Sequence, residues 1–119
     1  MATRTLTPFR VEDQRLAELA KVLSHPARIE ILRILAERQS CVCGEVVEVL
    51  PLAQATVSQH LKELKQAGLI QGTVEGPYSC YCLNPEGMAE LQTLLSGLWQ
   101  VLGNSAQAAM QPAAACCPP

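Results

Sequence analysis

A chain of 119 residues can bury one modest hydrophobic core, which excludes two independently folded domains. Aromatic residues make up only 3% of it, so the core must be built from Leu, Ile, Val and Ala, a composition that favours packed helices. The formal net charge of -2 argues against binding nucleic acid by bulk positive charge, but residues 1–33 carry six basic and four acidic side chains, so any DNA contact must be local.

The N-terminus and the cysteine content bear on the cellular compartment. The chain begins Met1-Ala2-Thr3-Arg4 without the apolar stretch of a signal peptide, and no run approaches the roughly 18 apolar residues of a membrane span. We therefore expect a cytoplasmic protein that does not contact membranes. Six cysteines could form a disulfide framework, but that needs an oxidising compartment. Free thiols, metal ligation or redox sensing are favoured instead.

Two helices are predicted after an N-terminal arm of residues 1–10. Residues 11–23 repeat apolar side chains at a helical period, with charged side chains on the other face. Ser24-His25-Pro26 then supplies a cap residue and a proline that the first helical turn tolerates. The helix that starts there is rich in Ile and Leu, so we expect it at the centre of the core.

A helix-turn-helix is predicted next. A short third helix is expected over residues 41–49, ended by Leu50-Pro51, and a fourth over residues 54–67, closed by Gly68. Two short helices joined by a tight turn, the second with a polar free face, are typical of a helix-turn-helix. An ordinary helical hairpin fits the same pattern.

A β-hairpin is expected to follow as a wing. Residues 69–75 and 78–83 are rich in strand formers and are separated by the turn residues Gly76-Pro77. The predicted fold class is therefore mainly α with a small β-hairpin, a winged helix-turn-helix.

The last predicted helix begins at Asn84-Pro85-Glu86 and carries more apolar surface than one small domain needs. Its Leu and Val residues recur every three or four positions, with Trp99 beside them. We expect the first and last helices to form a dimer interface, although this stripe could also cover the domain's own core. The winged domain would then span residues 11–103, and residues 104–119, which lack a periodic apolar face, would be a mobile tail.

The fourth helix has a face suited to the major groove of DNA. Placing Val57, Leu61 and Leu64 inward leaves polar side chains on the free face. Gln pairs with adenine, Ser and Thr reach base edges or phosphates, and Lys neutralises phosphates. The candidate DNA-binding residues are Gln54, Thr56, Ser58, Gln59, His60, Lys62 and Lys65. His60 lies at the apolar border and could be a packed residue, and on periodicity alone the face could simply be solvated.

Three segments together resemble the ArsR/SmtB family of metal-responsive repressors, of the arsenical-resistance type. They are the string LSHPARIEIL at residues 23–32, ATVSQHLKELKQAGLI at residues 55–70, and Cys41-Val42-Cys43. The resemblance runs from about residue 12 to residue 102, and the order and spacing of the segments are specific. It implies a homodimer that binds a palindromic operator in double-stranded DNA and dissociates when its inducer binds. It also matches Thr56, Ser58, Gln59, His60 and Lys62 to the family's DNA-reading helix.

The cysteines are the candidate sensor. Arsenite and antimonite prefer thiolate ligands, and Cys41 and Cys43 would supply them. On a regular helix these two residues are turned about 200° from each other, so both can hold one ion only if the backbone changes. The residues of that first turn are poor helix formers, and together they destabilise the helix by on the order of 2 kcal/mol relative to alanine. We therefore hypothesise that ligand binding unwinds it beneath the reading helix, with a coupling of about 1–3 kcal/mol.

A third thiolate is not evident in the Cys-Val-Cys segment. The family's arsenite sites commonly place a third cysteine three positions after the second, where this chain has Val46. Cys80 and Cys82 flank Tyr81 on a predicted strand, so they should point to one face and could form a second pair or donate a ligand, or they could be buried or idle cysteines. Cys116 and Cys117 in the tail could close over a site, bind a second ion or be incidental.

Other functions remain open at this point. Cadmium or lead could bind the same thiolates, and a thiol-oxidation switch is also possible. Zinc sensing through the last helix is disfavoured, because the histidines are His25 and His60 and neither lies there. A small thiol-rich metal carrier is the alternative of another class. No nucleophile, base and orienting group assemble, so we expect neither an enzyme nor a permanent cofactor.

Overall fold

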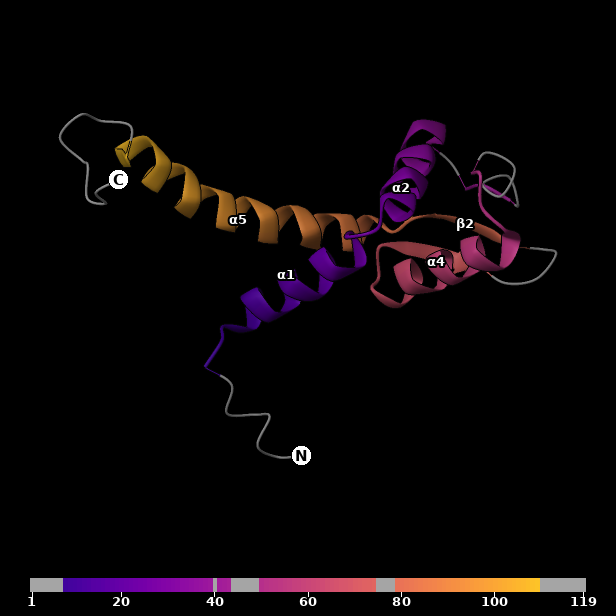
Figure 1. The fold of residues 1–119 in the computed structure, drawn as a ribbon, viewed down its shortest axis with the longest axis horizontal. Coiled ribbons are helices and arrows are strands. Elements are labelled where there is room, and N and C mark those ends of the chain that lie inside the picture. Colours follow the sequence, from indigo (N-terminus) through magenta and orange to yellow (C-terminus); the bar gives the residue numbers. More distant parts are fainter. Residues whose placement is uncertain (1–7, 40, 44–49, 75–78, 110–119) are drawn as a thin grey trace.

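The computed structural model describes residues 8–39, 41–43, 50–74 and 79–109, shown in colour in Figure 1. The order of elements is α1, α2, α4, β1, β2 and α5, and the two strands form an antiparallel hairpin. A mainly helical chain with one β-hairpin is the fold class that the sequence predicts. Within the described residues, no helix is long and apolar enough to cross a membrane.

The first two helices begin and end close to the predicted positions. α1 spans Val11–Val22, with Glu12 and Asp13 in its first turn, where negative charge is favourable. α2 spans Pro26–Arg38 with its proline at the first helical position, and it ends at Gln39, whose φ of 57° is left-handed.

The reading helix and the wing also form as predicted. α4 spans Gln54–Gln66, and Gly68 follows it with a φ of +85°, a conformation that suits glycine after a helix. β1 (Ile70–Thr73) pairs antiparallel with β2 (Cys80–Leu83), so that Ile70 lies opposite Leu83 and Thr73 opposite Cys80. The predicted turn at residues 76 and 77 lies outside the described residues.

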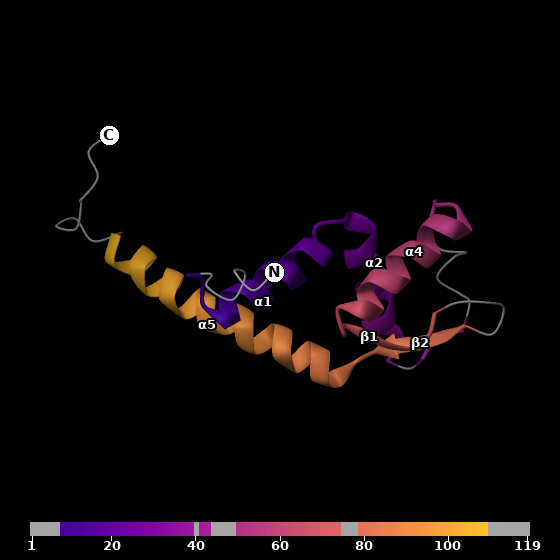
Figure 2. The ribbon, with the colours of Figure 1, turned by 90° about the horizontal axis from the view of Figure 1, so that it is seen from below.

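One core joins all the elements except the distal half of α5. It collects aliphatic side chains from α1, α2, α4 and the hairpin together with a single aromatic residue, and its most deeply buried members are Leu19, Ile31, Leu35, Val42, Val57, Leu64, Leu69, Ile70 and Tyr81. α1 packs against the proximal part of α5, whose far end extends away from the rest of the molecule in both views (Figures 1 and 2). The reading helix and the wing therefore lie at one end of the molecule and the free part of α5 at the other.

α5 is longer than predicted. It spans Pro85–Ala109, so placing the start of the mobile tail at Asn104 is wrong for residues 104–109. The stretch after Gly103 is rich in alanine, which extends an existing helix without needing a buried face. Residues 110–119, with the rest of the predicted tail, lie outside the described residues, as do residues 1–7 of the predicted arm.

The segment expected to open the third helix has a different structure. Cys41 and Cys43 are not helical, and Val42 between them forms an isolated antiparallel bridge with Tyr81 of β2. Two backbone hydrogen bonds make the bridge: Val42 N–H donates to the Tyr81 carbonyl at 2.8 Å, and Tyr81 N–H donates to the Val42 carbonyl at 3.0 Å. A helix starting at residue 41 is therefore a wrong prediction, and residues 44–49 lie outside the described residues.

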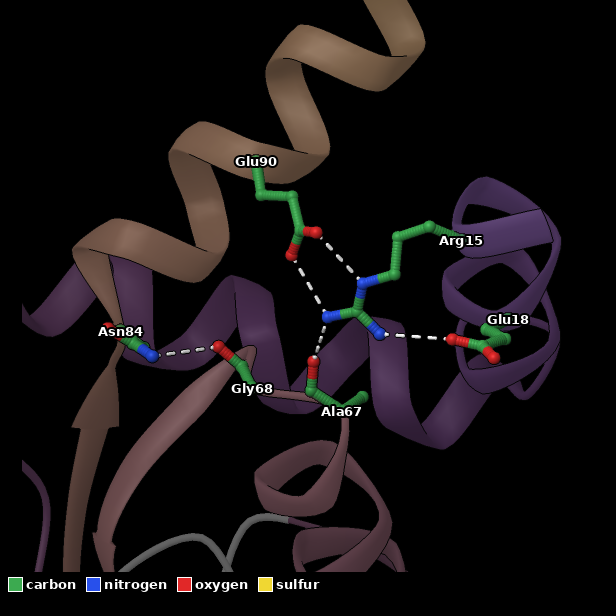
Figure 3. Close-up of polar contacts among 6 residues, drawn as sticks. All are labelled: Arg15, Glu18, Ala67, Gly68, Asn84 and Glu90. Atoms are coloured by element: carbon green, nitrogen blue, oxygen red, sulfur yellow. Dashed lines mark hydrogen bonds and ion pairs between the residues drawn. The ribbon is translucent and has the colours of Figure 1, made fainter. Parts of the chain in front are cut away.

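Arg15 ties three helices together (Figure 3). Its Nε and Nη2 donate to the two carboxylate oxygens of Glu90 on α5, both at 2.9 Å, and Nη2 also donates to the carbonyl of Ala67 at 2.8 Å, at the end of α4. Nη1 donates to Glu18 on its own helix at 3.3 Å. The Arg15 guanidinium and its hydrogen bond hold the pKa of Glu90 below its usual value, although burial acts in the opposite direction. The α1–α5 pair is thus linked directly to the last turn of the reading helix.

Candidate functional site

The exposed face of α4 is the one predicted from its periodicity. Val57, Leu61 and Leu64 are buried and fix the rotation of the helix. The opposite face carries the polar candidates, of which Gln54, Thr56, Gln59 and Lys65 are exposed and Ser58 and Lys62 are half-buried. Gln59 Nε2 donates to Glu63 Oε1 at 3.3 Å, a contact at the surface that can be exchanged for another partner.

The N-terminus of α4 lacks a side-chain cap. Ala53 occupies the N-cap position with extended backbone angles, and within the described residues no side-chain hydrogen bond caps the first turn. Unpaired N–H groups and the positive end of the helix dipole favour an anion at this place. The first turn of α4 is therefore suited to a DNA phosphate, and Thr56 and Gln59 lie beside it.

His60 differs from the other candidate DNA-binding residues. It is only 6% exposed and accepts a hydrogen bond on Nδ1 from Arg28 Nε at 3.1 Å, while its ring lies 4.6 Å from that of His25. Burial lowers the pKa of His60, and the charge of Arg28 lowers it further, so the neutral imidazole is favoured. In this position His60 joins α4 to α2, which favours the packed alternative over a contact with a DNA base.

The cysteines are brought together by the Val42–Tyr81 bridge. In an antiparallel pair, residues on either side of a bridge face each other, so Cys41 lies opposite Cys82 and Cys43 opposite Cys80. Side chains alternate along a strand, and since Val42 and Tyr81 point into the core, the cysteines share the outer face. We call Cys41, Cys43, Cys80 and Cys82 the cysteine quartet.

The quartet pairs across the two segments, not within them. Cys43 and Cys80 form a disulfide, whereas Cys41 and Cys82 are free, the former exposed and the latter half-buried. The two thiols interact, since a hydrogen bond with Cys82 raises the pKa of Cys41, and burial and the Cys82 charge raise it further. Gln71 Nε2 also lies 3.8 Å from the Cys82 sulfur. The unwinding of a first helical turn between Cys41 and Cys43 is therefore wrong, because these residues are not helical, whereas ion binding by the thiols of each motif stays a prediction.

Comparison with known proteins identifies the regulator class. The sequence model described as "Bacterial regulatory protein, arsR family" matches residues 25–71, from the start of α2 into β1. The arsenical resistance operon repressor of Bacillus subtilis is 39% identical over 77 residues, covering 64% of this chain and 70% of that protein. An uncharacterised HTH-type transcriptional regulator of Methanocaldococcus jannaschii is 35% identical over 86 residues, covering 71% of this chain and 96% of that protein. The chain belongs to the ArsR family.

A solved structure agrees with this assignment. The crystal structure of a possible transcriptional regulator for arsenical resistance superimposes with a TM-score of 0.60 and 26% identity, covering 74% of this chain and 93% of that one. The winged helix-turn-helix fold and the predicted family are thus confirmed. As an ArsR-family member the chain is a DNA-binding transcriptional regulator and not an enzyme, as the sequence predicts.

Part of the predicted ligand set lies outside the described residues. Val46, the position of the family's third cysteine, and the tail residues Cys116 and Cys117 lie outside the described residues. Among residues that the structure describes, no three His, Cys, Asp or Glu side chains are placed to hold a metal ion together, with Cys43 and Cys80 joined as a disulfide. One sequence signal could have revealed the quartet: both Cys-Val-Cys and Cys-Tyr-Cys place strand-forming apolar residues between two cysteines.

Proposed function

We propose that this ArsR-family regulator is a homodimeric repressor that leaves a palindromic operator when arsenite or antimonite binds thiolates of the cysteine quartet. The observation that carries the proposal is the meeting of four cysteines, from two distant segments, on the wing that follows the reading helix. In the reduced chain these are four soft sulfur ligands on one face, the donor type that trivalent arsenic and antimony prefer. The B. subtilis relative is named an arsenical resistance operon repressor, which agrees with this inducer class.

The DNA-binding part of the proposal rests on α4. Its exposed Gln, Thr and Lys side chains and its uncapped N-terminus supply base-edge contacts, phosphate contacts and a helix dipole. Because the net charge of the chain is -2, these local contacts must be doubled to hold an operator. A dimer placing two α4 helices on a palindrome does this.

The dimer part rests on α1 and α5. Apolar side chains on the far part of α5 are exposed: Leu95, Leu98, Trp99, Val101 and Leu102. Val11 and Phe9 at the start of α1 are exposed as well. A surface of this kind is typical of a subunit interface. Arg15 links it to the reading helix, because it bonds both Glu90 on α5 and the carbonyl of Ala67 at the end of α4.

The coupling between inducer and operator follows the wing. β2 carries Cys80 and Cys82, and its partner β1 follows α4 through Gly68, where Leu69 N–H donates to the Leu64 carbonyl at 3.0 Å. An ion that draws residues 41–43 and β2 into new sulfur spacings therefore moves the hairpin relative to the reading helix. A shift worth about 1–3 kcal/mol in operator affinity is enough for a regulatory response.

Operator release under arsenite tests the proposal. Fluorescence anisotropy follows a labelled duplex from upstream of the chain's own gene, bound by fully reduced protein. We expect arsenite to release the parent protein, and Cys41→Ser and Cys43→Ser to remain bound at the same concentration. Cys116→Ser/Cys117→Ser is the matched control and should respond like the parent. Unchanged release by both quartet variants would refute the assigned site, and release by cadmium or lead but not by arsenite would change the inducer.

A second candidate inducer is an oxidant, and the Cys43–Cys80 disulfide favours it. A hydroperoxide oxidises the two thiols to the disulfide and is itself reduced to an alcohol and water, fastening β2 to residues 41–43. If this is the signal, peroxide releases the operator from the parent but not from Cys43→Ser. A thiol-rich metal carrier would show no salt-dependent binding to the duplex at all.

A further inference from the structure

The two free thiols of the quartet open onto a pocket. A surface hollow of about 360 Å³ lies between the end of α2, the hairpin and the start of α5, and both Cys41 and Cys82 line it. Its other walls include the apolar side chains of Leu35, Ala36, Leu83 and Pro85. The volume lies near the lower end of the range of about 300–1,000 Å³ for small-molecule sites. A dithiol beside an apolar hollow is a different site from a cage of four sulfurs.

We propose that Cys41 and Cys82 form a two-thiolate site for a trivalent arsenical that carries one organic substituent, and that the site operates while Cys43 and Cys80 are joined. This deepens the proposed function, because it rests on thiolate capture as the signal. In the reaction, R–As(OH)₂ exchanges both hydroxyls for sulfur: two As–S bonds form, two As–O bonds break, and the two thiol protons leave with the hydroxyls as two waters. No electron is transferred. The substituent R occupies the pocket.

The disulfide decides which arsenical fits. Inorganic arsenite has three exchangeable hydroxyls, and with Cys43 and Cys80 joined the quartet provides only two thiols. A monosubstituted arsenical needs only those two, and its organic group gains contact with Leu35 and Leu83 that arsenite cannot make. Reduction of the disulfide restores four thiols and allows a third thiolate ligand. The redox state of one pair thereby selects the ligand of the other.

Phenylarsine oxide is the probe for this site. The experiment uses full-length Cys116→Ser/Cys117→Ser protein with the Cys43–Cys80 disulfide intact, so that Cys41 and Cys82 are the remaining thiols. Native mass spectrometry should show one phenylarsenic group per chain, and both thiols should become protected from iodoacetamide. Cys41→Ser and Cys82→Ser in this background should each lose the stable adduct. Retention of the adduct by either variant, or none in the parent, would overturn the proposal.

A pocket variant tests the seat of the substituent. Ala36→Phe places a larger side chain in the hollow from an exposed position of α2 and leaves both cysteines in the sequence, and circular dichroism checks that its helices are intact. It should weaken capture of the phenyl compound more than capture of the methyl analogue, whereas equal effects would refute the assigned pocket. Operator anisotropy separates the two proposals. An adduct that leaves DNA bound contradicts the proposed function alone, and release by arsenite without any phenylarsine adduct contradicts this inference alone.

Discussion

Reducing the Cys43–Cys80 disulfide should lower the free energy of unfolding substantially. The bond closes a loop between residues separated by 37 positions, from the residues before α4 to the wing. With that loop length, the loss of chain entropy in the unfolded state corresponds to about 4 kcal/mol, and measured disulfides often deliver about 2–4 kcal/mol. For a domain of this size we expect the melting temperature to fall by roughly 10 °C on reduction.

Thermal unfolding followed by circular dichroism, with and without a phosphine reductant, measures this effect at fixed protein concentration. Cys43→Ser/Cys80→Ser is the matched control and should melt near the reduced parent and be insensitive to the reductant. Cys116→Ser/Cys117→Ser should keep the full response. An unchanged melting temperature of the parent on reduction would refute the reasoning, because the bond would then place no constraint on the unfolded chain.

Three further predictions concern single side chains. Gln59→Ala should weaken operator binding by about 1–3 kcal/mol and relax the sequence preference at one base pair. Competition with operators substituted at single base pairs measures this preference, and equal weakening for all sequences would contradict a base contact. Glu90→Gln should cost less than about 1 kcal/mol at pH 7, since its pair with Arg15 is partly exposed. Because the pKa of Glu90 is lowered on folding, its contribution is fully present above the unfolded carboxyl pKa of about 4.3 and is lost as the pH falls through the folded value. The difference between variant and parent in urea titrations should therefore shrink as the pH is lowered below about 4.3. Cys82→Ala should lower the pKa of Cys41, seen as faster alkylation by iodoacetamide at pH 8, and a slower rate would show that the Cys82 contact does not hold the proton.

Local signals were enough to predict most elements of the fold. The proline at the start of α2, the glycine after α4 and the apolar periodicity of α4 and α5 act within a few residues, so they could be read directly. The same periodicity placed Gln59 on the exposed face of α4 and Leu61 on the buried face.

Contacts between distant segments could not be predicted in this way. Val42 is buried in the core beside Tyr81 and pairs with it through an isolated bridge, so residues 41–43 are extended and not helical. A single bridge leaves no periodic pattern in the sequence, so it could not be predicted. The cross-segment pairing of the quartet follows from that bridge. The periodicity of α4 could not decide between a packed and a DNA-facing His60 for a similar reason, because its hydrogen-bond partner Arg28 lies on another helix.

We propose that thiol chemistry on the wing controls the affinity of α4 for DNA. The most direct test is operator anisotropy with the reduced parent, titrated in turn with arsenite, antimonite, cadmium, zinc and peroxide, beside a variant with all four quartet cysteines changed to serine. We predict that arsenite and antimonite release the parent and leave the variant bound at every concentration used. Release of the variant at the same arsenite concentration as the parent would contradict the claim.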